Sequence, residues 1–227
     1  MLLELFTSEG CSSCPPADQL LGELAQRPPE SGAAPVIALE WHVDYWNYLG
    51  WSDPFSSAAN SERQSRYAAA LSAGRAYTPQ LVVDGRYECV GSSGSKVRAL
   101  LAQAGAQARK VRIQLARDPD PRAARIQVAI TEPPADGGRG AELWLLITES
   151  GLVTEVPRGE NAGKRLLHGP VVRSLRRLGT LTAAPLRLAA DLVLQPAWQR
   201  QNLRAVVLLQ RPGTGEILGA AQLALGG

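Results

Sequence analysis

Apolar residues at the start of the chain form a short continuous run and then recur at helical spacing. Residues 2–6 are interrupted by one polar residue and predict a buried strand. From Pro15 onward, apolar side chains recur three and four residues apart, which predicts a helix that opens on two prolines. Residues 35–42 predict a second strand. The chain therefore opens with strand, helix and strand, an order that favours a parallel pair joined by a right-handed crossover.

The spacing of apolar residues in the rest of the first half predicts further helices and strands. Asp84-Gly85 is a dipeptide typical of a two-residue hairpin turn. The complete order, strand–helix–strand–helix–strand–strand–helix, is that of a thioredoxin-like domain. Such a domain carries a cis-proline before its third strand, and Thr78-Pro79 stands at that place. The later elements are a helix at residues 56–73, strands at residues 80–83 and 86–90, and a helix at residues 94–106.

After about residue 110 the pattern becomes one of short, partly alternating segments. Turn sequences rich in proline, glycine and aspartate separate these segments. Several short strands at such spacing predict an antiparallel sandwich of immunoglobulin-like kind. The predicted fold is thus an α/β thioredoxin-like domain at residues 1–109, followed by an all-β immunoglobulin-like sandwich at residues 110–227. The alternating segments are residues 111–115, 124–130, 142–147, 186–192, 203–208 and 217–223.

Two cysteines, Cys11 and Cys14, lie between the first predicted strand and the first predicted helix. A helix N-terminus stabilises a thiolate, and the spacing of two residues lets the sulfurs form a disulfide. This combination suits thiol–disulfide exchange with protein thiols or disulfides, with the disulfide in place of a cofactor. We expect Cys11 to be the exposed nucleophile and Cys14 the resolving thiol. Ser12 and Ser13 could donate hydrogen bonds to the sulfur.

An aromatic stretch between residues 41 and 55 holds half of the aromatic residues of the chain. It could cover one edge of the sheet or form a wall of the cysteine site. In the second interpretation, Trp41 and Trp46 contact a substrate, together with Thr78 and Pro79.

The end of the second predicted strand carries two polar side chains, His42 and Asp44. An imidazole or a carboxylate at this place could accept the proton of the resolving thiol. The alternative is a hydrogen-bonded pair that only completes the end of the strand. A metal site is a further alternative, because Cys11, Cys14 and His42 could offer three ligands to copper or zinc. No second pair of closely spaced ligands is present to complete a tetrahedral site.

Four stretches resemble signature sequences of one bacterial family. They are residues 4–18, 42–55, 77–80 and 159–173. The family is DUF1223, a group of thioredoxin-like proteins of unknown function, many of which are predicted to be secreted. The resemblance implies the thioredoxin-like fold, a periplasmic or secreted location and, by analogy, thiol redox chemistry. A non-catalytic binding module of the same fold is the remaining alternative.

The last of these stretches contains Glu160, Asn161, His168 and Arg173 in an otherwise plain predicted sandwich. It could be a loop that caps its own sheet, with Glu160 paired to Arg173 and Asn161 closing a turn. It could instead pack against the first domain near residues 41–51 and help to wall the cysteine site, since clefts between domains are common binding sites.

Composition and charge narrow the class of protein further. The chain has 227 residues, of which 45% are hydrophobic and 20% are charged, as in an ordinary globular protein. The net charge of +3 comes from scattered arginines, which argues against nucleic acid as a partner. No apolar run approaches the roughly 18–20 residues of a membrane span, and we expect no signal peptide because Met1 runs directly into the first strand. The third cysteine, Cys89, is expected to be a buried small apolar residue.

Overall fold

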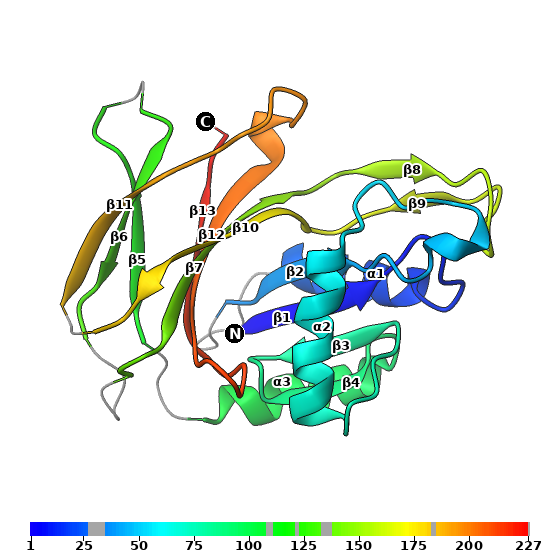
Figure 1. Ribbon diagram of the computed structural model, residues 1–227, viewed down its shortest axis with the longest axis horizontal. Helices are drawn as coiled ribbons and strands as arrows, with labels where there is room; N and C mark the ends of the chain where they lie inside the picture. The colour runs from blue at the N-terminus through cyan, green and yellow to red at the C-terminus, as the bar shows by residue number, and fades with distance from the viewer. Residues whose placement is uncertain (27–34, 108–110, 121–122, 133–137, 183–184, 227) are drawn as a thin grey trace.

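The computed structural model describes residues 1–26, 35–107, 111–120, 123–132, 138–182 and 185–226, and one large sheet dominates it (Figure 1). Its strands are β1 (Leu2–Thr7), β2 (Ile37–His42), β3 (Gln80–Val83), β4 (Tyr87–Val90), β7 (Glu142–Glu149), β10 (Val171–Thr180), β12 (Leu203–Gln210) and β13 (Ile217–Ala224). They lie in the order β13-β12-β7-β10-β2-β1-β3-β4. The parallel neighbours are β1 with β2 and β2 with β10, and the other pairs are antiparallel.

Three α-helices cover the β1–β4 end of this sheet. They are α1 (Pro15–Gln26), α2 (Ala58–Leu71) and α3 (Gly94–Gly105), and short 3-10 turns lie at Asn47–Leu49 and Arg200–Asn202. Side chains on one face of β1 pack with Tyr67 of α2, whereas Leu3 and Leu5 on the other face pack with residues of α1 and α3. Alternate residues of a strand point to opposite faces, so β1 is buried on both sides. Every residue of β1 is buried.

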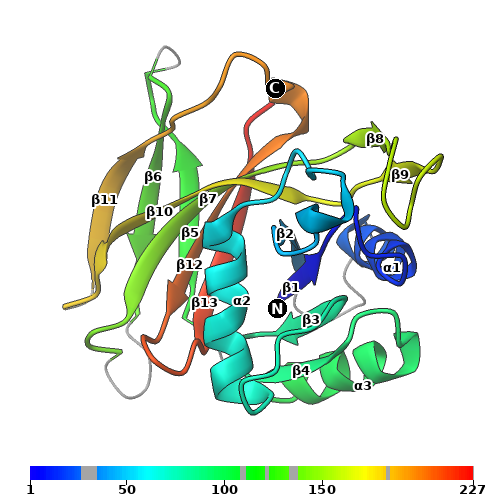
Figure 2. The ribbon, with the colours of Figure 1, turned by 45° about the vertical axis from the view of Figure 1, so that its right-hand side comes forward.

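The remaining strands form two smaller sheets. The first contains β5 (Ile113–Arg117), β6 (Arg125–Ile130) and β11 (Leu186–Asp191) in the order β11-β6-β5. It packs against β7, β12 and β13 through one apolar cluster, and Figure 2 shows the two sheets side by side. The second is the hairpin of β8 (Val153–Glu155) and β9 (Arg165–Leu167), which extends toward α1.

The predicted fold class is wrong. The first-half elements occur in the expected order, but they do not form a separate thioredoxin-like domain, and the second half is not a free-standing immunoglobulin-like sandwich. Strand β10 pairs with β2 at Val171 and Glu40, so strands from both halves share one mixed sheet. The predicted boundary between residues 109 and 110 lies outside the described residues.

The physical reason for this error is the burial of the central strands of the second half. Residues 203–209 of β12 contribute alternately to the cluster under the three-stranded sheet and to the cluster under α2. Strand β7 is divided between the same two clusters. Both strands are therefore covered on both faces. A strand of a two-layer sandwich, in contrast, has one face exposed to solvent. Continuous apolar runs such as residues 205–209 are typical of strands that are covered on both faces.

Two local predictions from the sequence are confirmed. The Thr78–Pro79 peptide bond is cis. The turn at Asp84-Gly85 joins β3 to β4, with positive φ at both residues. Among the described residues, no helix has the length and apolar character needed to cross a membrane.

Candidate functional site

Cys11 and Cys14 form a disulfide at the point where the chain leaves β1 and enters α1. The prolines at positions 15 and 16 occupy the first turn of α1, where their missing N–H groups have no intrahelical partner. The Cys14 carbonyl accepts hydrogen bonds from the N–H groups of Ala17 and Asp18, at 2.8 and 3.1 Å. Cys14 therefore lies at the N-terminus of the helix, where the backbone dipoles favour negative charge.

The expectation that Cys11 is exposed is wrong for the disulfide form. Cys11 is 1% exposed and Cys14 is fully buried, while the two serines between them are exposed. The hydroxyl of Ser13 lies 3.4 Å from the Cys11 Sγ, so one of the two predicted serine–sulfur contacts is present. A partner thiol would therefore meet the disulfide from the side of Ser12 and Ser13.

The loop between β8 and β9 covers the cysteine loop, residues 8–14, which joins β1 to α1. Asn161 is fully buried, and its side-chain amide donates hydrogen bonds to the carbonyls of Glu9 and Cys11, at 2.8 and 3.0 Å. The backbone N–H of Ser12 donates to a carboxylate oxygen of Glu160 at 2.9 Å. Hydrogen bonding by the Ser12 hydroxyl and by the Ser12 backbone N–H lowers the pKa of Glu160. The loop from the second half thus holds the cysteine loop by three hydrogen bonds.

Arg173 does not pair with Glu160. Its guanidinium lies 3.6 Å from a carboxylate oxygen of Glu149 and 5.1 Å from the ring centre of Phe55. The contacts of Glu160 and Asn161 are instead those of a loop packed against the first half of the chain.

Trp46 connects the cysteine loop to the Thr78–Pro79 segment. Its indole N–H donates to the Thr78 hydroxyl at 2.8 Å, and a Cβ at Gly10 would come within 3.0 Å of its Cβ. Trp46 stacks on Tyr48, which is 78% exposed. Trp41 is instead a core residue, 1% exposed and stacked on Phe6, so it offers no surface to a substrate.

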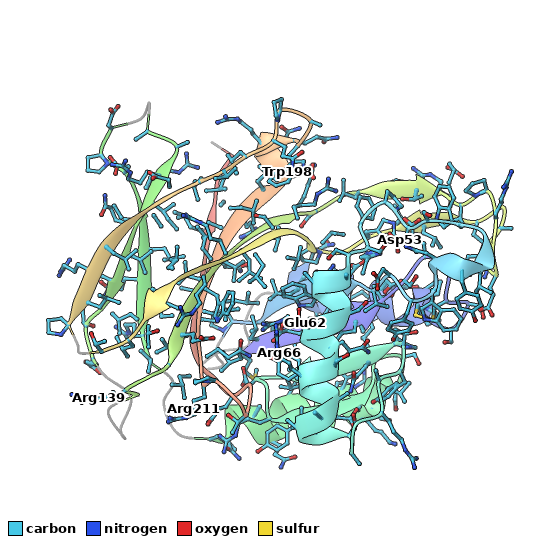
Figure 3. The ribbon with its side chains drawn as sticks, viewed as in Figure 1. Asp53, Glu62, Arg66, Arg139, Trp198 and Arg211 are labelled. Carbon is cyan, nitrogen blue, oxygen red and sulfur yellow. A yellow bond between two sulfur atoms is a disulfide. The ribbon has the colours of Figure 1, made fainter. Side chains whose placement is uncertain are left out.

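A buried cluster of carboxylates and imidazoles lies beside the cysteine loop. His42, at the end of β2, has Nδ1 2.7 Å from Asp53 Oδ2 and Nε2 2.9 Å from Glu40 Oε1. Figure 3 shows Asp53 on the segment between β2 and α2. Asp53 also accepts a hydrogen bond from the backbone N–H of Glu9 at 2.9 Å, which ties the cluster to the cysteine loop.

His168 enters the same cluster from the segment before β10. Its Nδ1 lies 3.3 Å from Glu40 Oε1, and its Nε2 lies 3.1 Å from Glu9 Oε1 and 3.2 Å from the Thr154 hydroxyl. Glu9 Oε1 is at ion-pair distance from the ring but has no aligned hydrogen-bond donor. The other oxygen of Glu9 accepts a hydrogen bond from the Trp51 indole at 2.6 Å.

The cluster shifts the pKa values of its members in opposite directions. Burial alone would raise the pKa of Glu40 and lower that of His168, but the hydrogen bonds and charges between them outweigh burial. The pKa of Glu40 falls to about 2 and that of His168 rises to about 9. Burial also opposes the shift at His42, yet Asp53 and Glu40 raise the pKa of His42 well above its usual value.

Asp18 is a buried acid on the first turn of α1, one turn after Cys14. Its carboxylate accepts a hydrogen bond from the Thr7 hydroxyl at 2.6 Å. Burial, reinforced by the negative charge of Glu40, raises the pKa of Asp18 to about 8. Residues four apart on a helix share one face, so this carboxyl lies on the face that carries Cys14. At neutral pH it is mostly protonated.

The polar residues around the disulfide differ from those that the sequence predicts. His42 belongs to the buried cluster, whereas Asp44 contacts the hydroxyl of Ser61 on α2 and takes no part in it. Glu9, Asp18, Glu40 and Asp53 were missed. Glu40 had a usable signal, because a carboxylate inside the apolar run of a strand needs a buried partner. Cys89 is buried, as expected, and burial raises the pKa of its thiol.

Comparison with known proteins gives one family and two similar structures. A family model described as "Protein of unknown function (DUF1223)" matches residues 2–210. The X-ray crystal structure of protein AGR_C_4864 from Agrobacterium tumefaciens is 28% identical, with a TM-score of 0.77, and the match covers 100% of this chain and 94% of that chain. HBP35 of Porphyromonas gingivalis is 14% identical, with a TM-score of 0.67 and coverage of 99% and 74%, and shows the fold alone. Neither description names a thioredoxin. No curated protein matches the chain.

Proposed function

This chain belongs to the DUF1223 family, and we propose that it is a thiol–disulfide oxidoreductase that works through Cys11 and Cys14. The observation that carries the proposal is the placement of the disulfide. It lies at the N-terminus of α1, and the buried acid Asp18 follows Cys14 by one helical turn. The helix dipole stabilises the thiolate that leaves, and a protonated acid beside it can supply a proton.

The exchange that reduces the disulfide of this protein proceeds in two steps. A thiolate of the partner attacks the Cys11 sulfur, the Cys11–Cys14 bond breaks, and Cys14 leaves as a thiolate that takes the proton of Asp18. A second partner thiolate then attacks the partner sulfur of the mixed disulfide and releases Cys11 as a thiolate. The partner is oxidised to a disulfide by two electrons, and the protein holds a Cys14 thiol and a Cys11 thiolate. Water returns the proton of Asp18 and can protonate Cys11, and the reverse sequence reduces a partner disulfide.

The Trp46–Tyr48 stack offers an aromatic surface to a protein partner. Trp46 contacts both the cysteine loop and Thr78, and Tyr48 is exposed. Aromatic side chains supply much of the energy of protein interfaces at a low entropic cost. A partner segment seated there would approach the buried disulfide from the side of the exposed Ser12 and Ser13.

Trapping of a mixed disulfide tests this proposal. A Cys14→Ser variant cannot resolve a mixed disulfide at Cys11, so a small peptide that carries an activated disulfide should remain attached at Cys11 after its leaving thiol departs. Peptide mass mapping identifies the attachment site, and the double variant Cys14→Ser/Cys89→Ser is the matched control that must still react. Attachment at Cys89 alone, or no attachment within hours at pH 7, would contradict the proposal.

A further inference from the structure

The two histidines of the chain, His42 and His168, lie together although 125 residues separate them in sequence. Their ring centres are 5.1 Å apart, and His42 is 1% exposed and His168 is 7% exposed. One nitrogen of each ring faces the same oxygen atom, Oε1 of Glu40, at 2.9 and 3.3 Å. The chemistry proposed for the disulfide makes no use of this convergence.

We propose that Glu40, His42 and His168 hold one divalent first-row transition-metal ion, for which Zn²⁺ is the probe. The ligand atoms are Oε1 of Glu40, Nε2 of His42 and Nδ1 of His168. Two imidazoles and one carboxylate are a common protein ligand set for zinc, and a small molecule completes the coordination. Sulfur takes no part, so this site is distinct from one built on the cysteines.

The outer nitrogens of both rings support this assignment. Nδ1 of His42 lies 2.7 Å from Asp53 Oδ2, and Nε2 of His168 lies 3.2 Å from the Thr154 hydroxyl and at ion-pair distance, 3.1 Å, from Glu9 Oε1. Metal-ligating histidines almost always place the nitrogen that does not bind the metal on a carboxylate, a carbonyl or a water, which fixes the tautomer and the ring orientation. Here both rings have a buried carboxylate on the outer side and a shared carboxylate on the inner side.

The orientation of the Glu40 carboxylate is set by the backbone at Gly169. The Gly169 N–H donates to Oε2 of Glu40, which leaves Oε1 directed at the two rings. A Cβ at position 169 would come within 2.7 Å of Oε2, so this approach requires glycine. A tetrahedral centre with bonds of about 2.0–2.2 Å separates its ligand atoms by about 3.3–3.6 Å. The three ligand atoms lie within 4.8 Å of one another, so the most distant pair needs to close by at most about 1.5 Å.

Because the ligands come from β2 and from the segment before β10, the ion would fasten the two halves of the chain to each other.

Zinc binding by the oxidised protein tests the proposal. The full chain is prepared without a histidine tag and with the Cys11–Cys14 disulfide intact, and Zn²⁺ is titrated in competition with a chromophoric chelator. We expect one Zn²⁺ per chain and a rise in melting temperature with added Zn²⁺. X-ray absorption at the zinc edge should show nitrogen and oxygen neighbours, imidazole outer-shell scattering and no sulfur. The chain has no other histidine, so imidazole scattering identifies these two rings.

Variants separate this site from adventitious binding. Glu40→Gln keeps the shape of the side chain and should weaken binding by at least about tenfold, and Asp53→Asn should weaken it by about 10- to 100-fold. Glu155→Gln, which changes an exposed carboxylate of β8, should leave the affinity unchanged. Sulfur scattering, binding only after reduction of the disulfide, or no stoichiometric binding by the wild-type protein would each overturn the proposal. The wild-type spectrum decides the matter even if a variant fails to fold.

Discussion

Substitution of the buried acid Asp18 by asparagine should change the stability of the protein in a pH-dependent way. The carboxyl has a pKa of about 8 in the folded protein, against an ordinary value of 3.8. Because the folded protein holds the proton more tightly, Asp18 lowers the stability as pH rises from about 4 to about 8. Below about pH 4 the carboxyl is protonated in both states, and this loss is absent.

The magnitude follows from the two pKa values. Each pH unit between them costs about 1.4 kcal/mol, so the loss reaches about 4 kcal/mol at pH 7. Asparagine is neutral in both states and can still accept the hydrogen bond of Thr7. Any change in packing caused by Asp18→Asn is independent of pH. The stability of the variant relative to the wild type should therefore increase by about 1.4 kcal/mol for each pH unit from 5 to 7.

Urea unfolding at pH 5, 6, 7 and 8, with the disulfide intact, measures this difference. A Thr7→Val variant gives a second measurement. The Thr7 hydroxyl lowers the pKa of Asp18, so removing this hydroxyl should raise that pKa. The decrease of stability with pH should then continue above pH 8. A difference in stability between wild type and Asp18→Asn that stays constant from pH 5 to 7 would show that folding does not raise the pKa of Asp18. The disulfide of the Asp18→Asn variant should also be reduced more slowly than that of the wild type at neutral pH, because Cys14 loses its proton source.

The remaining predictions concern the loop and the core. Asn161→Ala removes two hydrogen bonds to the cysteine loop, worth about 2 kcal/mol together. Reduction of the disulfide by dithiothreitol should therefore become faster, by up to about thirtyfold. An unchanged rate would show that the loop between β8 and β9 does not limit access to Cys11. Glu4→Gln leaves the buried Arg63 guanidinium without its anion and should lower the free energy of unfolding by about 3–5 kcal/mol, measured by urea unfolding; a loss below 1 kcal/mol would contradict a buried ion pair. Gly169→Ala should destabilise the chain and lower its zinc affinity together, as melting and titration would reveal, whereas zinc affinity equal to that of the wild type would argue against the orientation assigned to Glu40.

Local structure around the cysteines could be predicted from the sequence because it depends on neighbours in the chain. The prolines after Cys14 mark the start of α1, and Asp84-Gly85 marks the hairpin turn. The fold class could not be obtained in this way. Alternation and turn signals describe single strands, and they do not say that β10 joins β2 across the two halves. The continuous apolar run of β12 was the available signal that a strand of the second half is central to a sheet.

The residues that surround the disulfide were harder to predict from the sequence than the position of the disulfide itself. His168 and Glu40 meet across 128 residues, and no periodicity of either segment predicts that contact. Glu4 and Glu40 share a pattern that could have been used, since each is a carboxylate inside an apolar strand and each has a buried cationic partner. Asn161 gave no such signal, because a polar residue in a loop is ordinary unless its partners are known.

The proposed function requires that the Cys11–Cys14 disulfide exchanges with thiols rather than serving as a structural cross-link. A redox titration of the full chain in glutathione buffers, with quenching by alkylation and quantification of Cys11 and Cys14 by mass spectrometry, distinguishes these two roles. We expect a two-electron transition between about −270 and −120 mV, the range of known oxidoreductases. A potential below about −300 mV would mark a structural disulfide and rule out the proposed exchange.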